Sequence, residues 1–320
     1  MHRASYAAEE DLVGLDVNDG LVVVARVKTG RDGQLYLRNA GWAECPAGVP
    51  DRVMAAAIRR AWWTAGMPSH TVCAAFRSRA VVLRYFKYPA LTREEFEAAL
   101  RLEAEENLQL PPQEIVLDWH LNQFAAPGTD GAATRPYEGL LAAAPLKEVT
   151  QFMAVLRLAG LYPVALDLGA TAITNLFHAQ QTDRRLREDT CVLHLTRQGA
   201  DIAVLFERHG LYARTVFARS VSWESSLDYL AESVKDAFKY YEFKLRGAPV
   251  QRLFVTGRLP TTPDFTAQLA HALGVPVEVW DPLARIAPGS LRVKRLLRRR
   301  ETLPPLGLCI GLALRRYGHA

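Results

Sequence analysis

The chain has few cysteines and no cluster of metal-binding side chains. Its four cysteines are widely separated, at Cys45, Cys73, Cys191 and Cys309. Neither a CxxC pair nor a zinc-type spacing of histidine and cysteine occurs, and the eight histidines show no ligand spacing. The sequence therefore predicts neither a disulfide framework nor a metal site. Isolated thiols are typical of a reducing compartment, which favours the cytoplasm.

The sequence also lacks a long hydrophobic segment. Residues 1–11 are polar and acidic, without the apolar stretch of a secretory signal. The longest apolar run near the end, residues 306–314, is about half the length needed to span a bilayer. With 49% hydrophobic and 23% charged residues, the composition is that of a soluble globular protein. A chain of 320 residues is long enough for two domains.

Two stretches of the chain follow the same plan. The sequence VGLDVNDGLVVVARV begins at Val13, and CVLHLTRQGADIAVLF begins at Cys191, about 180 residues later. Each has an apolar strand, a polar turn and a second apolar strand. A third strand follows each pair, in QLYLRN from Gln34 and in LYARTVF from Leu211. A β-meander that occurs twice predicts a duplicated, two-domain α/β chain.

Local signals place helices and a linker between these strands. Thr92 and Glu95 have the spacing of a capping box and predict a helix that ends before Pro111. A helical stripe of apolar residues predicts a long helix over residues 227–245. The segment QTDRRLRED from Gln181 is charged and nearly free of apolar residues, so we expect the linker there.

Several segments, in order and spacing, resemble the PilM family of type IV pilus assembly proteins. They are YPALTREEFEAALRLEAEENLQLPPQEIVLDW from Tyr88, LLAAAPLKEVTQFMAVLRLAGLYPVALDL from Leu140, SVKDAFKYYEFKL from Ser233, VTGRLPTTPDFTAQLAHALGVPVEVWDP from Val255, and LPPLGLCIGLALR from Leu303. The resemblance covers nearly the whole chain. It implies an actin-like (ribonuclease H-like) duplicated α/β fold, related to the cell-division protein FtsA.

The same resemblance implies a domain organisation. Residues 1–185 would form the first actin-like half, with an FtsA-like subdomain inserted at about residues 88–165. Residues 186–320 would form the second half, whose last helix, at about residues 306–316, packs back on the first half.

A PilM-like chain is expected to act as an adaptor rather than as an enzyme. The resemblance implies a cytoplasmic protein at the inner membrane that binds the N-terminal cytoplasmic tail of a PilN-like membrane protein. Through that complex it would connect with PilO-like and PilP-like proteins and with the pilus motor ATPase. Contact with the membrane would be peripheral and indirect, no nucleic acid partner is expected, and a homodimer stays open. Residues 77–89 and the helix from Glu94 lie where the tail groove is expected, although Tyr85, Phe86 and Tyr88 are also explained by ordinary strand packing.

In the actin superfamily the first turn of each meander holds ATP phosphates, and here both turns depart from the family pattern. Asp16 is kept in the first turn, but Asn18 replaces the glycine, and Asp19 and Leu21, on either side of Gly20, replace hydroxyl residues. In the second turn Asp201 is kept, while His194, Thr196 and Ala200 replace an acid, a glycine and a hydroxyl residue. The glycine pair of the adenosine turn becomes Gly257 and Arg258. The prediction is a vestigial ATP site formed by Asp16, Asn18, Asp19, Gly20, Asp201 and Gly257, with no resident cofactor.

Alternatives remain for three features. Arg258 or a charged His194 would compensate for the lost groups if the chain were a nucleotide-binding ATPase whose ATP state regulates pilus assembly, with Mg-ATP as its cofactor. The sequence LDLGAT from Leu166 resembles a phosphate turn, but its context predicts a strand-to-helix step. The basic run over residues 292–300 is either a solvated surface or a contact for lipid, nucleic acid or an acidic partner.

Overall fold

The computed structural model describes residues 12–18, 20–121, 136–180, 188–197, 199–206, 210–218, 226–259, 264–298 and 305–315. The chain forms two compact units. Unit 1 comprises Met1–Phe76, Phe152–Gln180 and Asp281–Ala320, and unit 2 comprises Arg77–Gln151 and Gln181–Trp280. Within the described residues, no helix has the length and hydrophobicity needed to cross a membrane.

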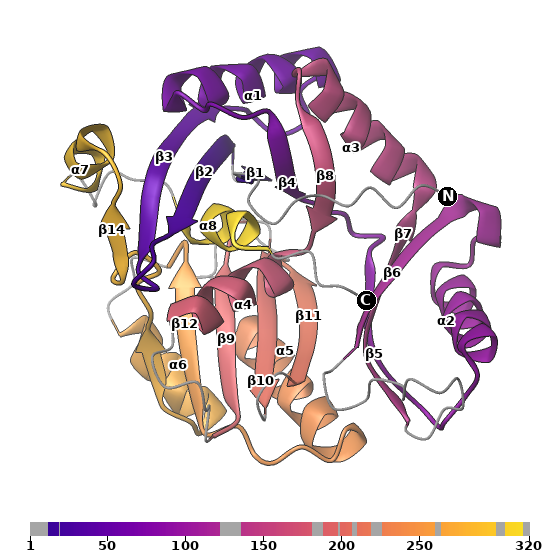
Figure 1. Ribbon diagram of the computed structural model, residues 1–320. Coiled ribbons are helices and arrows are strands. Elements are labelled where there is room, and N and C mark those ends of the chain that lie inside the picture. The colour runs from indigo at the N-terminus through magenta and orange to yellow at the C-terminus, as the bar shows by residue number, and fades with distance from the viewer. Residues whose placement is uncertain are drawn as a thin grey trace. The chain divides into compact units, whose positions relative to one another are not determined.

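Unit 1 is built on a six-stranded sheet in the order β14-β3-β2-β1-β4-β8 (Figure 1). The first meander supplies three antiparallel strands, and β4 and β8 continue the sheet in parallel. The strands are β1 (Val13–Asn18), β2 (Leu21–Thr29), β3 (Leu35–Glu44), β4 (Thr71–Ala75), β8 (Tyr162–Asp167) and β14 (Ile286–Pro288). The helices are α1 (Asp51–Ala65), the end of α3 (Leu146–Leu158), α4 (Gly169–Gln180), α7 (Leu291–Leu297) and α8 (Gly307–Ala313).

Successive residues of β1 point to opposite faces of this sheet, and different helices cover the two faces. Val13 and Leu15 are fully buried in the core that α1 and the end of α3 share. Gly14, between them, faces the other side, where the backbone of α8 approaches it. The core on the α1 side is completed by Ile58, Ala61 and Trp62 from α1 and by Val155 and Leu156 from α3.

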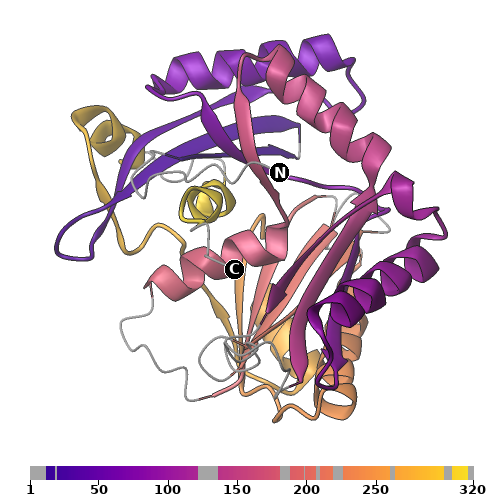
Figure 2. The same ribbon diagram turned by 45° about the vertical axis from the view of Figure 1, so that its right-hand side comes forward.

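Glycines allow α8 to lie between β1 and α4. A Cβ atom at Gly14 would overlap the carbonyl oxygen of Cys309, and one at Gly311 would overlap the carbonyl oxygen of Ala172 in α4. The Cys309 thiol lies 3.2 Å from the Val23 carbonyl oxygen of β2. Figure 2 shows α8 alongside α4. The last helix therefore packs against elements of the first meander through close backbone contacts.

Unit 2 contains a five-stranded sheet in the order β11-β10-β9-β12-β13. The second meander forms β9 (Thr190–Leu195), β10 (Gly199–Phe206) and β11 (Gly210–Phe217), all antiparallel. After α5 (Leu227–Lys239), β12 (Arg252–Gly257) pairs in parallel with β9, and α6 (Phe265–Leu273) leads to β13 (Val277–Val279). Both sheets thus begin with an antiparallel meander and continue with parallel strands, which is the duplication that the sequence predicted.

The predicted helix over residues 227–245 changes its winding near its end. The α-helix stops at Lys239, and Tyr240–Lys244 form one π-helical turn. The Tyr241 ring is buried there, and its hydroxyl donates to Asp189 Oδ2 over 2.6 Å. A π-helical turn is rare and usually limited to a single turn, and here it coincides with the buried, hydrogen-bonded Tyr241.

A three-stranded antiparallel sheet, in the order β5-β7-β6, also belongs to unit 2. It consists of β5 (Val82–Tyr88), β6 (Ile115–Leu121) and β7 (Tyr137–Pro145), and α2 (Arg93–Leu108) covers one face. The predicted capping box starts α2, because Thr92 Oγ1 accepts from the Glu95 amide while the Glu95 carboxylate accepts from the Thr92 amide. Phe96 anchors the helix on the sheet by stacking on Tyr137 at 4.0 Å between ring centroids.

The units divide the chain differently from the expected halves. β5 begins at Val82, before the expected start of the insertion at residue 88. β8 begins within the expected insertion of about residues 88–165, yet it pairs with β4 in the sheet of unit 1. Residues 281–320 also belong to unit 1. Strand partners are chosen by packing between distant segments, which a single sequence does not display.

The close contact at Gly311 makes a testable prediction. Replacing a helical glycine with alanine normally raises helix stability by about 1 kcal/mol. In Gly311→Ala the new methyl group would meet the backbone of α4, so we expect the free energy of unfolding to fall by about 1–3 kcal/mol. Urea denaturation followed by circular dichroism measures the difference. A gain in stability would contradict the close approach of α8 and α4.

Candidate functional site

The first meander turn, where the sequence placed phosphate contacts, is a tight hairpin. β1 ends at Asn18 and β2 begins at Leu21, and these two residues pair across the ladder. Gly20 has a φ of 82° and its carbonyl oxygen accepts from the Cys45 amide over 2.8 Å. Asp16 and Asn18 are buried, and Asp19 lies outside the described residues. An anion nest needs successive backbone amides that are not bonded within a sheet. Because the β1–β2 ladder continues to the pair of Asn18 and Leu21, few residues of this turn lie outside it.

The second meander turn is closed by hydrogen bonds between two of its own residues, Thr196 and Gly199. Leu195 and Ala200 pair across β9 and β10, so the turn lies between them. The Gly199 amide donates to Thr196 Oγ1 over 3.0 Å, and the Thr196 amide donates to the Gly199 carbonyl oxygen over 2.9 Å. The threonine therefore uses the Gly199 amide that a phosphate would otherwise approach.

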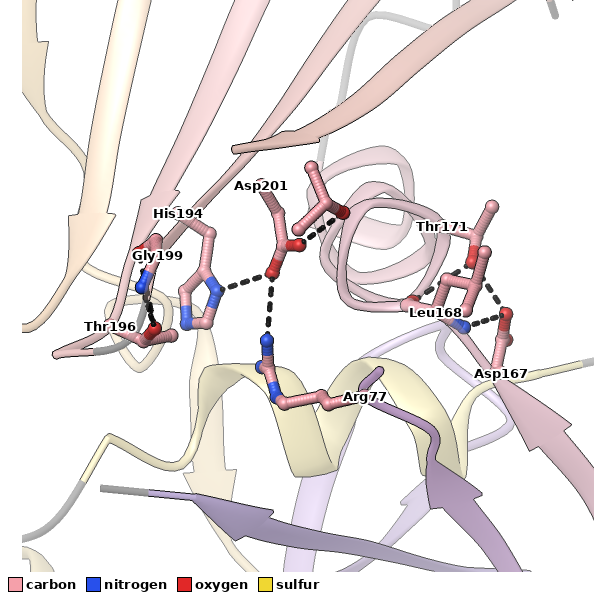
Figure 3. A network of polar contacts seen from close by, with 9 residues as sticks. Arg77, Asp167, Leu168, Thr171, His194, Thr196, Gly199 and Asp201 are labelled. Carbon is pink, nitrogen blue, oxygen red and sulfur yellow. Dashed lines mark hydrogen bonds and ion pairs between the residues drawn. The ribbon is translucent and has the colours of Figure 1, made fainter. Parts of the chain in front are cut away.

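Asp201 is the centre of a buried polar cluster in unit 2 (Figure 3). It lies on β10 between His194 of β9 and Thr215 of β11, its direct neighbours across the ladders. Thr215 donates to Oδ1 over 2.9 Å, and His194 Nδ1 lies 3.2 Å from Oδ2. Arg77 completes the cluster with its guanidinium nitrogen 3.5 Å from Oδ2. The Asp201 side chain is only 1% exposed, so these three groups surround a carboxylate that solvent barely reaches.

The cluster keeps Asp201 ionised. Burial by itself would raise the pKa of this carboxyl group. The charge of Arg77 and the hydrogen bonds from His194 and Thr215 together outweigh burial, so the pKa of Asp201 lies below its usual value. A carboxylate whose oxygens already accept three partners offers little to a divalent cation. Among the described residues, no group of three or more acids, histidines or cysteines could hold a metal ion.

Gly257, assigned to the adenosine turn, has a structural reason to be glycine. Its φ is 93°, a conformation that other residues rarely adopt. A Cβ atom there would lie 2.9 Å from the His194 ring and would overlap the Leu195 carbonyl oxygen. Arg258 follows, and its amide donates to the same carbonyl oxygen over 2.8 Å. Gly257 therefore lets β12 pack closely against the strand that carries His194.

The sequence LDLGAT forms a strand-to-helix step in unit 1, as its context predicted. Asp167 ends β8, and its Oδ1 atom accepts from the Leu168 amide over 2.8 Å and from the Thr171 hydroxyl in the first turn of α4. Arg315 lies 2.9 Å from the other carboxylate oxygen. Asp167 thus contacts the first turn of α4 and pairs with an arginine that follows α8.

The structure groups the predicted site residues by unit. Asp16, Asn18 and Gly20 lie at the first turn of unit 1, whereas Asp201, His194 and Gly257 lie together in unit 2. Sequence reasoning missed Thr215 and Arg77. The meander pattern could have placed Thr215 opposite Asp201, because alternate residues of adjacent strands share a face. Nothing in the sequence around Arg77 marks it as the partner of an acid on β10.

The pairing of Arg77 with Asp201 predicts a large loss of stability in Arg77→Met. Removing one member of a buried pair leaves an uncompensated charge, so we expect the free energy of unfolding to fall by about 3 kcal/mol. The matched control is Arg93→Met, which breaks the exposed Arg93–Glu97 pair and should cost less than about 1 kcal/mol. Denaturant unfolding of both variants makes the comparison. Equal losses would show that Arg77 acts like a surface residue.

The same cluster predicts a pH dependence. The folded-state pKa of Asp201 is below the ordinary 3.8, so its carboxylate contributes stability above that pH. The contribution is lost as the pH falls below about 4 and passes through the folded-state pKa. In Asp201→Asn this component should be missing, which makes the unfolding free energy less dependent on pH in the acid range. Identical acid profiles of the two proteins would refute the assignment.

Comparison with known proteins gives matches to solved structures alone. No protein-family model matches the sequence, and no curated protein matches it. A chain of the "PilM-PilN type IV pilus biogenesis complex" is similar over 96% of this chain and 98% of its own length, with a TM-score of 0.80 and 20% identity. The cytoplasmic domain of EpsL, an inner-membrane component of the Vibrio cholerae type II secretion system, covers 93% of this chain and 98% of its own, with 11% identity and a TM-score of 0.49. A Bacteroides thetaiotaomicron protein with an actin-like ATPase fold and unknown function covers 90% and 95%, with 12% identity and a TM-score of 0.49.

The first of these likenesses confirms the fold that the sequence resemblance implied. It extends over nearly the whole of both chains. The chain therefore has the duplicated, actin-like α/β fold found in the PilM–PilN complex.

Proposed function

We propose that this chain is a non-catalytic adaptor of a type IV pilus or related secretion assembly. It would bind the N-terminal cytoplasmic tail of a PilN-like inner-membrane protein. The observation that carries the proposal is the structural likeness to a chain of the PilM–PilN complex, with a TM-score of 0.80 over 96% of this chain. The sequence segments that resemble PilM proteins support the same assignment independently.

The adaptor would be located at the cytoplasmic face of the inner membrane. Its link to PilO-like and PilP-like proteins and to the motor ATPase would run through the PilN-like partner. Membrane association through that partner is indirect, and a homodimer is compatible with the proposal.

The absence of catalysis is supported by the two meander turns. The phosphate contacts expected at Asn18 and Gly20 fall on a tight hairpin, and the Gly199 amide is used by Thr196. Asp201 is neutralised internally by Arg77. Each lost phosphate contact would weaken binding by about 1–3 kcal/mol, and several together would push ATP affinity toward the millimolar range. We therefore propose a vestigial site that retains neither ATP nor Mg as a resident cofactor.

A groove between α2 and β5 lies in the region predicted for the tail. It has a volume of about 570 Å³ and is lined by Arg84, Tyr88, Ala99, Leu102, Glu103, Glu106 and Asn107. The Tyr88 hydroxyl donates to the Glu103 carboxylate, and Arg84 donates to the Asn107 side chain. These four polar side chains of the lining therefore bond to one another in two pairs. Leu102 is 58% exposed, and Glu106 is exposed beside it. We propose that an apolar side chain of the tail packs on Leu102 and that a basic one faces Glu106.

The predicted aromatic residues of β5 have a different role. Tyr85 and Phe86 are buried, and Phe86 packs against Phe96 of α2 at 5.5 Å between centroids. Tyr85 packs against Phe206 of β10 at 6.4 Å. Ordinary strand packing therefore explains these two side chains. Only Tyr88 of the three lines the groove, and burial together with Glu103 and Glu106 raises the pKa of its hydroxyl.

Calorimetry with the full chain tests the proposed function. A synthetic N-terminal tail of a PilN-like protein encoded beside this chain should bind with a measurable heat, while Mg-ATP should give none. Tail binding without ATP binding supports the adaptor. ATP binding tighter than about 50 μM, roughly −6 kcal/mol, would favour the nucleotide-regulated alternative, and failure of the tail to bind would overturn the partner assignment.

The groove is tested by substituting its exposed leucine. Leu102→Asp should weaken tail binding at least about tenfold, because burying a leucine contributes about 1.5–3 kcal/mol. The control is Leu158→Asp, since Leu158 is a similarly exposed leucine, at 50%, at the end of α3. Glu106→Lys should also weaken binding of a basic tail, with the exposed Glu148→Lys as its control. Unchanged affinity in both groove variants would place the tail elsewhere.

A further inference from the structure

The short helix α7 presents an unusual surface in unit 1. Leu291 is 77% exposed, and the basic side chains at Arg292, Lys294, Arg295 and Arg298 are exposed as well. At 3.6 residues per turn these five residues occupy one continuous arc of about 160°. Leu291 lies near the middle of that arc, with basic residues on both sides. We call these five residues the basic face.

The opposite side of α7 fixes this face to the sheet. Val293 is 1% exposed, and Leu296 and Leu297 are half-buried, at the spacing of one helical stripe. The helix begins at Ser290, whose hydroxyl oxygen accepts from the Val293 amide over 3.2 Å. Just before it, the Gly289 amide donates to the Leu37 carbonyl oxygen over 2.8 Å, next to the parallel pairing of β14 with β3. The basic face is therefore held against the sheet of unit 1.

The charges on this face are all positive. No acidic residue occurs between Pro282 and Arg298. Within the described part of the chain, no hydrogen bond or ion pair joins the side chains of the four basic residues to another residue. Arg38 on the adjacent β3 is also exposed and donates to the Gly289 carbonyl oxygen over 3.0 Å. Arg299 and Arg300 lie outside the described residues and are not part of the face.

We propose that the basic face is a direct contact for an anionic lipid surface. Four cations around an exposed leucine match an interface in which phosphate headgroups surround the boundary of the acyl chains. Single-stranded nucleic acid would be expected to use aromatic side chains for stacking, and the face has none. An acidic protein would leave the central leucine without a partner unless it offered an apolar side chain at that point.

This contact goes beyond the proposed function, in which membrane association is indirect. Each lysine or arginine near an anionic membrane strengthens association by about fivefold, and the attraction decays within a Debye length. Four such residues give useful but reversible binding. The contact would orient a chain that a membrane partner already holds, rather than anchor it alone.

Vesicle co-sedimentation of the full chain tests the proposal. The probe is a vesicle of phosphatidylcholine with about 30% phosphatidylglycerol, compared with phosphatidylcholine alone, at about 0.1 M and 0.5 M salt. We expect binding to the anionic vesicles at low salt and its loss at high salt or without anionic lipid. The fourfold variant R292Q/K294Q/R295Q/R298Q should bind at least about tenfold more weakly, and Leu291→Asn should bind several-fold more weakly while keeping every charge.

A matched variant separates a specific face from net charge. R52Q/R60Q/K147Q/R157Q removes three arginines and one lysine that are exposed elsewhere, so its net charge equals that of the fourfold variant. Thermal unfolding confirms that all variants are folded. The proposal predicts that this control binds within about twofold of the unaltered protein.

The proposal is overturned if the unaltered protein does not bind anionic vesicles, or if both fourfold variants lose binding equally. It is also overturned if a nucleic acid duplex or an acidic peptide binds through the same four residues while vesicles do not. The tail calorimetry does not depend on lipid, so a failure here leaves the adaptor assignment to its own test.

Discussion

The burial of one charged group, the Asp201 carboxylate, imposes the strictest constraint on unit 2. A carboxylate that is 1% exposed is tolerated only where hydrogen bonds and an opposite charge replace its water. Thr215 and His194 provide hydrogen bonds from the two flanking strands, and Arg77 provides the charge. Arg77 is the first residue of unit 2, so the pair also fixes the segment that leads into β5 against the five-stranded sheet. The Asp201 carboxylate therefore serves as an internal structural charge of unit 2.

Unit 1 uses the same kind of compensation at the end of β8. Asp167 accepts from the Leu168 amide and the Thr171 hydroxyl at the start of α4 and pairs with Arg315 beyond α8. In both units an arginine distant in sequence neutralises an acid at a place where the chain could otherwise present negative charge to a cation. Gly14 and Gly311 let α8 pack closely against β1 and α4. Arg315, just after the end of α8, then reaches Asp167. Packing and charge pairing are therefore parts of one arrangement.

The sequence predicted what is local or repeated. Alternation revealed both meanders, the Thr92–Glu95 spacing located the start of α2, and the context of LDLGAT indicated a strand-to-helix step rather than a phosphate turn. The sequence did not predict the Arg77–Asp201 pair, because the two residues are 124 positions apart and no motif links them. The return of β8 to the first sheet and the π-helical turn at Tyr240–Lys244 were missed for the same reason. Both features depend on contacts between segments that are distant in sequence, and a local sequence pattern does not specify those contacts.

The internal use of these acids bears on how such an adaptor could be controlled. A ligand shifts a conformational equilibrium only by the difference between its affinities for the two states. On the proposed function, a triphosphate meets a closed hairpin turn, an amide already bound by Thr196 and a carboxylate already paired with Arg77. None of these groups gains a new partner from the nucleotide, so little differential affinity is available to drive a switch. The basic residues of α7 and Leu102 of α2, by contrast, are exposed. On the proposed function, these exposed groups are where protein and membrane contacts would act on the chain, rather than the meander turns.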